Sequence, residues 1–201
     1  MIMMERIRQQ IKAQPVGEPF VSRSLLSLGS RAAVDQVLTR LTREGLISRV
    51  ARGVYVRPKE NRFVGRVVPE AREIVTVMAK AKGEVIQMHG AEAVLRLGLT
   101  TQVPMKPLFY TSGPSRMLQI GKQEVVLKHA SPCLYSLGNG LAGIAFSALH
   151  YMGKKQVTPE ILSKVQRLMP PEEFSALRKS PHLPAWLSDL FHQCEKEMIH
   201  G

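Results

Sequence analysis

The sequence contains few of the residues that disulfide-rich and metal-dependent proteins use most. Cys133 and Cys194 are its only cysteines, and Asp35 and Asp189 are its only aspartates. Two isolated cysteines exclude a disulfide-rich extracellular scaffold, so we expect a cytoplasmic protein with reduced thiols. The scarcity of aspartate leaves no locally paired aspartates for Mg²⁺, which argues against nucleotidyl transfer and other metal-dependent chemistry.

Long apolar segments are also scarce. The N-terminal methionines are followed at once by Glu5, Arg6 and Arg8, which leaves no apolar region for a signal peptide. The longest uncharged stretch, residues 130–153, contains Pro132 and four glycines. We therefore expect this stretch to form a buried loop and helix, and we expect no membrane partner.

Positive charge is abundant and unevenly placed. The chain carries 28 Lys+Arg against 16 Asp+Glu, a net charge of +12. Residues 1–66 hold 13 of these cations, 11 of them arginine, against five acidic residues, which gives +8; residues 67–201 hold only +4. A basic first third favours an anionic partner such as nucleic acid.

Capping residues and apolar spacing predict the elements of this basic third. Helices are expected over residues 3–13, 23–28 and 31–44, a short extended segment at 20–21, and strands over 46–50 and 54–57. Ser22 and Ser30 are the predicted helix caps, Gly45 ends the third helix, and Gly53 permits a tight hairpin turn. The expected core comprises Ile7, Ile11, Leu25, Leu26, Leu28, Val34, Val37, Leu38 and Leu41.

This order of helices followed by a hairpin is typical of a winged helix-turn-helix. The predicted fold class is α+β: a winged helix-turn-helix over residues 1–62, then a mixed α/β domain over 63–201 that ends in a helical tail. Residues 58–61 are predicted to be a polar linker. The second domain is expected to contain helices at 70–82, 90–97, 141–152, 159–168, 171–178 and 184–198, and strands at 84–88, 107–111, 117–120 and 123–129.

The helix over 31–44 has the side chains that DNA recognition requires on the face opposite its core stripe. Arginine can bind guanine through two hydrogen bonds, and glutamine can bind adenine in the same way. Arg31 and Gln36 lie near the helix N-terminus, where base contacts usually occur, whereas Arg49 and Arg52 flank the hairpin turn. The candidate DNA contacts are Ser22, Ser30, Arg31, Gln36, Arg40, Arg43, Arg49 and Arg52.

The same residues can also be explained by roles in structure alone, without DNA binding. An arginine-rich helix face is often only a solvated surface, and winged helices also bind proteins. Asp35 could form an i,i+4 ion pair with Arg31, and the two serines could act only as helix caps.

Several short motifs resemble AbiEi-type antitoxins, which belong to type IV (abortive infection) toxin–antitoxin systems. They are Gly29-Ser30-Arg31-Ala32-Ala33-Val34-Asp35-Gln36, Ala51-Arg52-Gly53-Val54-Tyr55, Gly98-Leu99-Thr100-Thr101-Gln102-Val103-Pro104, Thr111-Ser112-Gly113-Pro114-Ser115-Arg116, Ile120-Gly121 and His129-Ala130-Ser131-Pro132. The similarity covers roughly residues 20–150. It implies a bacterial antitoxin whose N-terminal domain represses its own promoter and whose C-terminal domain counteracts a nucleotidyltransferase toxin, with which it need not form a stable complex.

Within the second domain the resemblance directs attention to basic residues near the predicted hairpin. Arg116, Lys122 and Lys128 are the candidate antitoxicity residues, through contacts to an anion or RNA. The alternative is a loop that is polar only because it is exposed. The resemblance supplies no catalytic residue.

Two further patterns could indicate other chemistry. Residues 138–143 match G-x-G-x-x-G and precede a helix, but no clear βαβ unit follows, so a glycine-rich turn that packs a buried helix is the better interpretation. His129 and Cys133, with His192 and Cys194, do not have the spacing of a common zinc module. We therefore expect no cofactor and no metal.

The sequence thus predicts a cytoplasmic, non-enzymatic antitoxin and autorepressor that binds duplex DNA at its own promoter. The alternative is a stand-alone transcription regulator whose C-terminal domain senses a small ligand. An enzyme with a basic RNA-docking head is a third hypothesis, which the shortage of aspartate and the absence of a recognisable catalytic triad disfavour.

Overall fold

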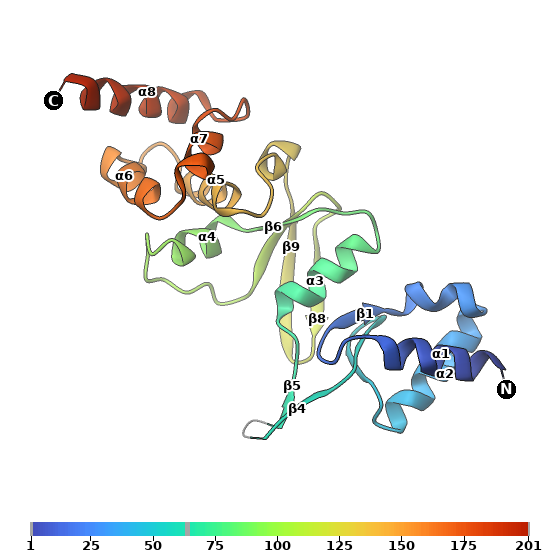
Figure 1. Cartoon of the computed structure of the whole chain (residues 1–201). Helices are drawn as coiled ribbons and strands as arrows, with labels where there is room; N and C mark the ends of the chain where they lie inside the picture. The colour runs from blue at the N-terminus through green and yellow to red at the C-terminus, as the bar shows by residue number, and fades with distance from the viewer. Residues whose placement is uncertain (1, 63–64, 201) are drawn as a thin grey trace. The chain divides into compact units, whose positions relative to one another are not determined.

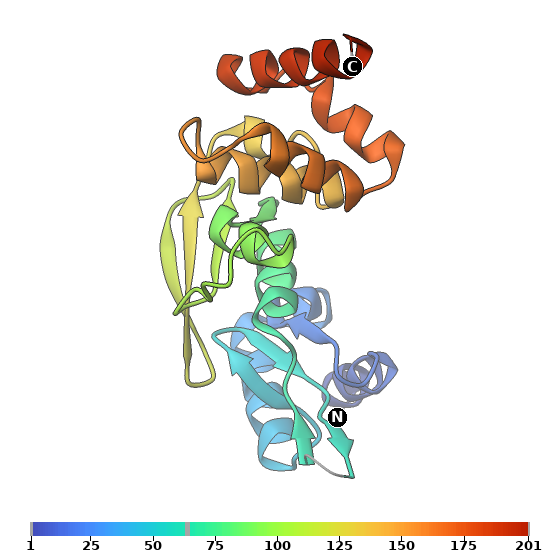
Figure 2. The same ribbon diagram turned by 90° about the vertical axis from the view of Figure 1, so that its left-hand side faces the viewer.

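The computed structural model describes residues 2–62 and 65–200, which form a mixed α+β protein (Figures 1 and 2). The chain folds into two compact units. One comprises Met1–Val85 and Met117–Val125, and the other comprises Ile86–Arg116 and Val126–Gly201. The predicted α+β class and the helical C-terminal region are confirmed, whereas a domain boundary after residue 62 stays a prediction.

The first unit begins with helices and a small antiparallel sheet of order β1-β3-β2. Its elements are α1 (Ile2–Ala13), β1 (Pro19–Val21), the 3₁₀ helix η1 (Ser22–Leu28), α2 (Arg31–Arg43), β2 (Ser48–Ala51), β3 (Val54–Val56), β4 (Lys59–Asn61), β5 (Gly65–Val67) and α3 (Ala71–Lys80). In the sheet, Tyr55 of β3 lies opposite Phe20 on one side and Arg49 on the other. The helices and the hairpin therefore occur in the expected order.

Most of the predicted core of this unit is confirmed, but Leu26 is an exception. Ile7, Ile11 and Leu25 are completely buried, whereas 36% of Leu26 is exposed. The short helix is 3₁₀ rather than α-helical. With three residues per turn, Leu25 and Leu28 share one face of η1 and Leu26 points elsewhere.

The predicted linker at residues 58–61 is wrong, because this segment contains a strand. β4 pairs antiparallel with β5, with Lys59 opposite Val67. Lys59, Glu60 and Asn61 are all polar, so this segment lacks the alternation of apolar and polar residues that usually identifies a strand. Backbone pairing with a later segment forms this ribbon, and local side-chain patterning could not reveal it.

The second unit combines strands with five α-helices among the described residues. Its elements are β6 (Ile86–Met88), α4 (Gly90–Arg96), β7 (Leu108–Thr111), η2 (Pro132–Tyr135), α5 (Leu141–Met152), α6 (Pro159–Arg167), α7 (Pro171–Arg178) and α8 (Ala185–His200). Two further strands, β8 (Arg116–Ile120) and β9 (Gln123–His129), have residues in both units. The sheet has the order β6-β7-β9-β8, in which β6 and β7 are antiparallel and β7 and β9 are parallel.

Helix α5 lies at the centre of the core of the second unit. Every residue from Ala142 to Leu149 is buried, as expected for the helical part of the long uncharged stretch. α4 packs closely against α5 because Gly90 has no side chain: a Cβ atom there would lie 2.6 Å from the carbonyl oxygen of Ser147. Among the described residues, no helix has both the length and the apolar composition needed to cross a bilayer.

Candidate functional site

Helix α2 presents opposite faces to the core and to solvent. The Oγ atom of Ser30 accepts a hydrogen bond from the backbone N–H of Ala33 at 3.4 Å, which confirms the predicted cap. At the other end, the N–H of Leu46 bonds to the carbonyl oxygen of Leu41 past Gly45, whose φ is +75°. The solvent face carries Arg31, Ala32, Asp35, Gln36, Thr39, Arg40 and Arg43.

The exposed face of α2 contains a shallow depression of about 590 Å³. Three of the predicted DNA contacts, Gln36, Arg40 and Arg43, line it together with Asp35, and Arg31 lies about one turn before Asp35. The side chains of Gln36 and Arg43 make no hydrogen bond or ion pair within the part of the chain that the structure describes. Their polar groups are therefore available to an external partner.

Two arginines on this face have intramolecular partners. Arg31 lies 3.8 Å from Asp35, so the i,i+4 pair foreseen from sequence is present, although 78% of the Arg31 side chain and 52% of the Asp35 side chain remain exposed. Arg40 binds Glu44 at 3.1 Å, and Glu44 also binds Arg8 of α1 at 2.6 Å. Arg40 thus helps to hold α1 against α2, a structural role that the sequence did not reveal.

The hairpin of β2 and β3 turns at Gly53, whose φ is +75°, and Arg52 is exposed there. The N–H of Ser22 donates to the carbonyl oxygen of Gly53 at 2.9 Å, which ties the turn to the end of β1. The expected capping role of Ser22 is wrong, because η1 begins at Ser22 itself and has no side-chain cap. Arg49 is exposed, and its Nε donates to the carbonyl oxygen of Ala51 at 3.4 Å.

The three candidate antitoxicity residues are distributed over both compact units. Arg116 and Lys128 belong to the second unit, whereas Lys122 lies in the turn between β8 and β9 that belongs to the first. Nη1 of Arg116 donates to the carbonyl oxygen of Pro114 at 3.2 Å. Lys122 and Lys128 are exposed.

The glycine-rich segment 138–143 packs against the N-terminus of α5. A Cβ atom at Gly143 would lie 1.9 Å from the carbonyl oxygen of Gly138, so this position has no room for a side chain. The carboxylate of Glu173, from α7, accepts a hydrogen bond from the N–H of Ala142 at 2.7 Å. An internal carboxylate therefore occupies the end of the helix at which a dinucleotide phosphate would bind.

The histidines and cysteines considered as metal ligands have other contacts. His129 bonds to the carbonyl oxygen of Gly113 at 2.9 Å, and His192 bonds to the carbonyl oxygen of Ser188 at 2.8 Å. The Sγ atom of Cys133 lies 2.7 Å from the Oγ atom of Ser131, and neither Cys133 nor Cys194 is part of a disulfide. Within residues 2–62 and 65–200, no three His, Cys, Asp or Glu side chains gather into a group that could hold a metal ion.

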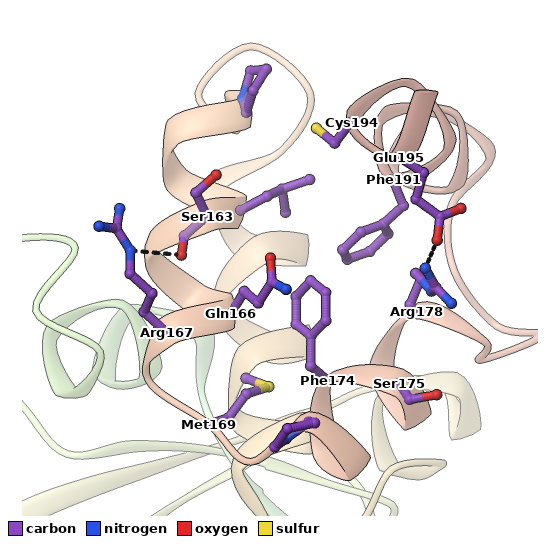
Figure 3. A pocket seen from close by; sticks show the side chains of 13 residues that line it. Ser163, Gln166, Arg167, Met169, Phe174, Ser175, Arg178, Phe191, Cys194 and Glu195 are labelled. Carbon is purple, nitrogen blue, oxygen red and sulfur yellow. Dashed lines mark hydrogen bonds and ion pairs between the residues drawn. The ribbon is translucent and has the colours of Figure 1, made fainter. Parts of the chain in front are cut away.

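A cavity of about 620 Å³ lies between α6, α7 and α8 (Figure 3). The rings of Phe174 and Phe191 line it and contact each other edge to face, with centroids 5.7 Å apart. Arg178 and Glu195 form an ion pair at its side. The sequence predicts these helices but not the cavity, because their apolar residues have the same spacing as ordinary core positions.

The chain belongs to the DUF6088 family, a family of unknown function whose model matches residues 6–177. No curated protein matches the sequence. Among solved structures, the crystal structure of the RV2827C protein from Mycobacterium tuberculosis is similar, with a TM-score of 0.41 and 14% identity over 96% of this chain and 82% of that chain. A similarity at this level carries no argument about function.

Proposed function

We propose that this protein binds duplex DNA through a winged helix-turn-helix formed by α1 to β3. The observation that carries the proposal is the solvent face of α2, where the side chains of Gln36, in the half near the capped N-terminus, and Arg43, at the C-terminal end, are exposed without internal partners. The exposed Arg52 on the adjacent hairpin turn and the charge of +8 on residues 1–66 support the same function.

In this proposal, α2 enters the major groove with its N-terminal half toward the bases. Gln36 binds adenine, and Arg31 exchanges its exposed 3.8 Å pair with Asp35 for guanine. Such an exposed pair contributes only about 0–1 kcal/mol, so little opposes the exchange. Arg43 and the N–H groups after Ser30 contact phosphates, and Arg52 on the hairpin contacts the backbone or the minor groove.

We further propose that the DNA is the protein's own promoter and that the protein is a cytoplasmic, non-enzymatic antitoxin. The support is the resemblance of its motifs to AbiEi-type antitoxins. The second unit would then counteract a nucleotidyltransferase toxin, with Arg116 and Lys128, and Lys122 of the hairpin turn, as candidate contacts. A nucleotidyltransferase gene beside this one would be the genomic context that the proposal requires.

The test of DNA binding uses the full chain, because the first compact unit includes Met117–Val125. Fluorescence anisotropy would compare a duplex from the upstream region with a scrambled duplex of equal composition, over a series of salt concentrations. We expect tighter binding of the upstream duplex and a log Kd that rises steeply with log salt, by about 0.9 per phosphate contact. Equal affinity for both duplexes, or an affinity independent of salt, would contradict the proposal.

A regulator that senses a small ligand is the second candidate function, and the cavity between α6, α7 and α8 favours it. Its volume of about 620 Å³ lies within the range of small-molecule sites. This function is compatible with DNA binding by α2 and requires no toxin. A ligand that changes the affinity of the full chain for the upstream duplex would support it.

A further inference from the structure

We propose that the cavity between α6, α7 and α8 binds a small apolar monocarboxylate, with Arg178 as the group that binds the carboxylate. This inference deepens the second candidate function, since it names the class of ligand. It does not depend on DNA binding, because every residue of the cavity belongs to the second unit.

The interior of the cavity is suited to the apolar part of such a ligand. Leu162, Met169, Phe174 and Phe191 line it. Figure 3 shows the two phenylalanine rings and Met169 directed into the space. Aromatic rings and a flexible thioether can pack against either a hydrocarbon chain or a ring, which favours an apolar ligand of varied shape.

The polar groups at the cavity favour an anion over a cation. Two arginines, Arg167 and Arg178, line it against one acidic residue, Glu195. Arg167 donates through Nε to the carbonyl oxygen of Ser163 within its own helix, and Figure 3 shows its guanidinium on the far side of α6 from the phenylalanine rings. Arg178 is therefore the cation best placed for a ligand.

Arg178 can bind a second carboxylate while it remains paired with Glu195. A guanidinium has five N–H donors in a planar fork, and one carboxylate uses at most two of them. About a third of each partner's side chain is exposed, so the pair lies where a ligand can reach it. A ligand amine could approach Glu195 in the same way, but two arginines against one glutamate give the lining a net positive charge, which favours the anion.

The ligand would also connect two helices that the ion pair already joins. Arg178 is the last residue of α7, and Glu195 lies on α8. The only tryptophan of the chain, Trp186, also lies on α8 and packs against the core of the unit. Its fluorescence therefore reports on the environment of the helix that forms one wall of the cavity.

The experiment titrates the full chain with three probes of equal chain length: decanoate, decylamine and decanol. Calorimetry gives the affinity, and Trp186 fluorescence gives the response of α8. We expect decanoate to bind about tenfold more tightly than decanol, since a charge-assisted bidentate pair adds roughly that factor, and decylamine to bind most weakly. Equal binding of the three probes, or none at about 1 mM, would overturn the proposal.

Variants locate the binding site. Arg178→Gln should weaken decanoate binding about tenfold and change decanol binding little, because the alcohol has no carboxylate for the guanidinium, whereas the loss of the pair with Glu195 is common to both titrations. Ser175→Phe should weaken both probes by filling the space. The matched control is Lys154→Gln, which removes an exposed cation that does not line the cavity. Circular dichroism checks that each variant is folded. The assignment would be refuted if Lys154→Gln lost decanoate binding, or if Arg178→Gln bound decanoate as tightly as the parent protein.

Discussion

His89 is an ionisable side chain in a largely apolar environment. Only 5% of the residue is exposed, and its ring packs against Tyr110 and Tyr151 with centroids 4.4 Å and 5.4 Å away. Its Nδ1 accepts a hydrogen bond from the N–H of Ala91 at 3.2 Å and so caps α4. Burial lowers the pKa of His89 to about 4, and the positive charge of Lys128 adds to the effect.

This pKa makes the stability of the fold depend on pH. In the unfolded chain the pKa of a histidine is about 6.5, so between pH 6.5 and 4 the unfolded state binds a proton that the folded state does not. The stabilising effect of the neutral ring is therefore complete above pH 6.5. It is lost as the pH falls toward 4, and its maximum is about 3 kcal/mol.

The substitution His89→Asn tests this dependence. Asparagine can still cap α4 but does not titrate. At pH 7 the variant should be less stable than the parent protein, because it packs less well. On acidification the variant should then lose less stability than the parent protein does. Urea denaturation from pH 7 to pH 4 should show the stability difference between the parent protein and the variant falling by about 3 kcal/mol. The exposed His150→Asn is the control, and parallel pH profiles for His89→Asn and the parent protein would contradict the assignment.

At the scale of single elements, most features that depend on neighbouring residues were predictable from the sequence, apart from the cap expected at Ser22, and features that depend on distant residues were not. Ser30 and Gly45 delimit α2 because capping depends on a few adjacent backbone groups. The strand at Lys59–Asn61 escaped prediction because it exists through its pairing with Gly65–Val67. The solvent face of α2 was likewise visible in the sequence, whereas the link from Arg8 to Glu44 was not.

The N-terminus of α5 depends on a distant carboxylate. Glu173 accepts the N–H of Ala142 at 2.7 Å and complements the positive end of the helix dipole. Glu173→Gln should lower the free energy of unfolding by about 1 kcal/mol, measured by urea denaturation, because a neutral amide replaces a charge-assisted acceptor. The matched control is Glu172→Gln in the same first turn of α7, and an equal loss in both variants would show that the contact with α5 contributes nothing specific.

The proposed division of roles between α2 and the β2–β3 hairpin gives another prediction. Gln36→Ala should reduce the preference for the upstream duplex over a scrambled duplex, since a lost base contact costs about 1–3 kcal/mol of discrimination. Arg52→Ala should weaken both duplexes by a similar factor and flatten the salt dependence by about one phosphate contact. Anisotropy titrations with both duplexes measure these effects, and identical specificity profiles for the two variants would refute the division.

At the scale of the molecule, positive charge and the candidate sites are divided between two compact units. Residues 1–66 carry most of the net charge, but the first unit also includes Met117–Val125 from the hairpin of β8 and β9. The N–H of Gly121 in this hairpin bonds to the carbonyl oxygen of Val50 at 3.1 Å. Charge counts along the sequence could not anticipate this return of the chain, because it depends on tertiary contacts of a segment whose own pattern predicts only a hairpin.

The proposed functions should therefore be separable by mutation. Arg43→Ala combined with Arg52→Ala removes two exposed cations of the first unit. If the proposed antitoxin function is right, we expect this variant to derepress a promoter fusion while cells that express the proposed nucleotidyltransferase toxin still survive. Arg116→Ala lies in the second unit and should have the opposite effect, with repression retained and rescue lost. Reporter activity, survival and protein abundance would be measured in the same cells, so that a destabilised variant is recognised by its low abundance. Loss of repression and rescue together at normal abundance, in either variant, would show that the two activities depend on one shared surface and that the two-unit mechanism is wrong.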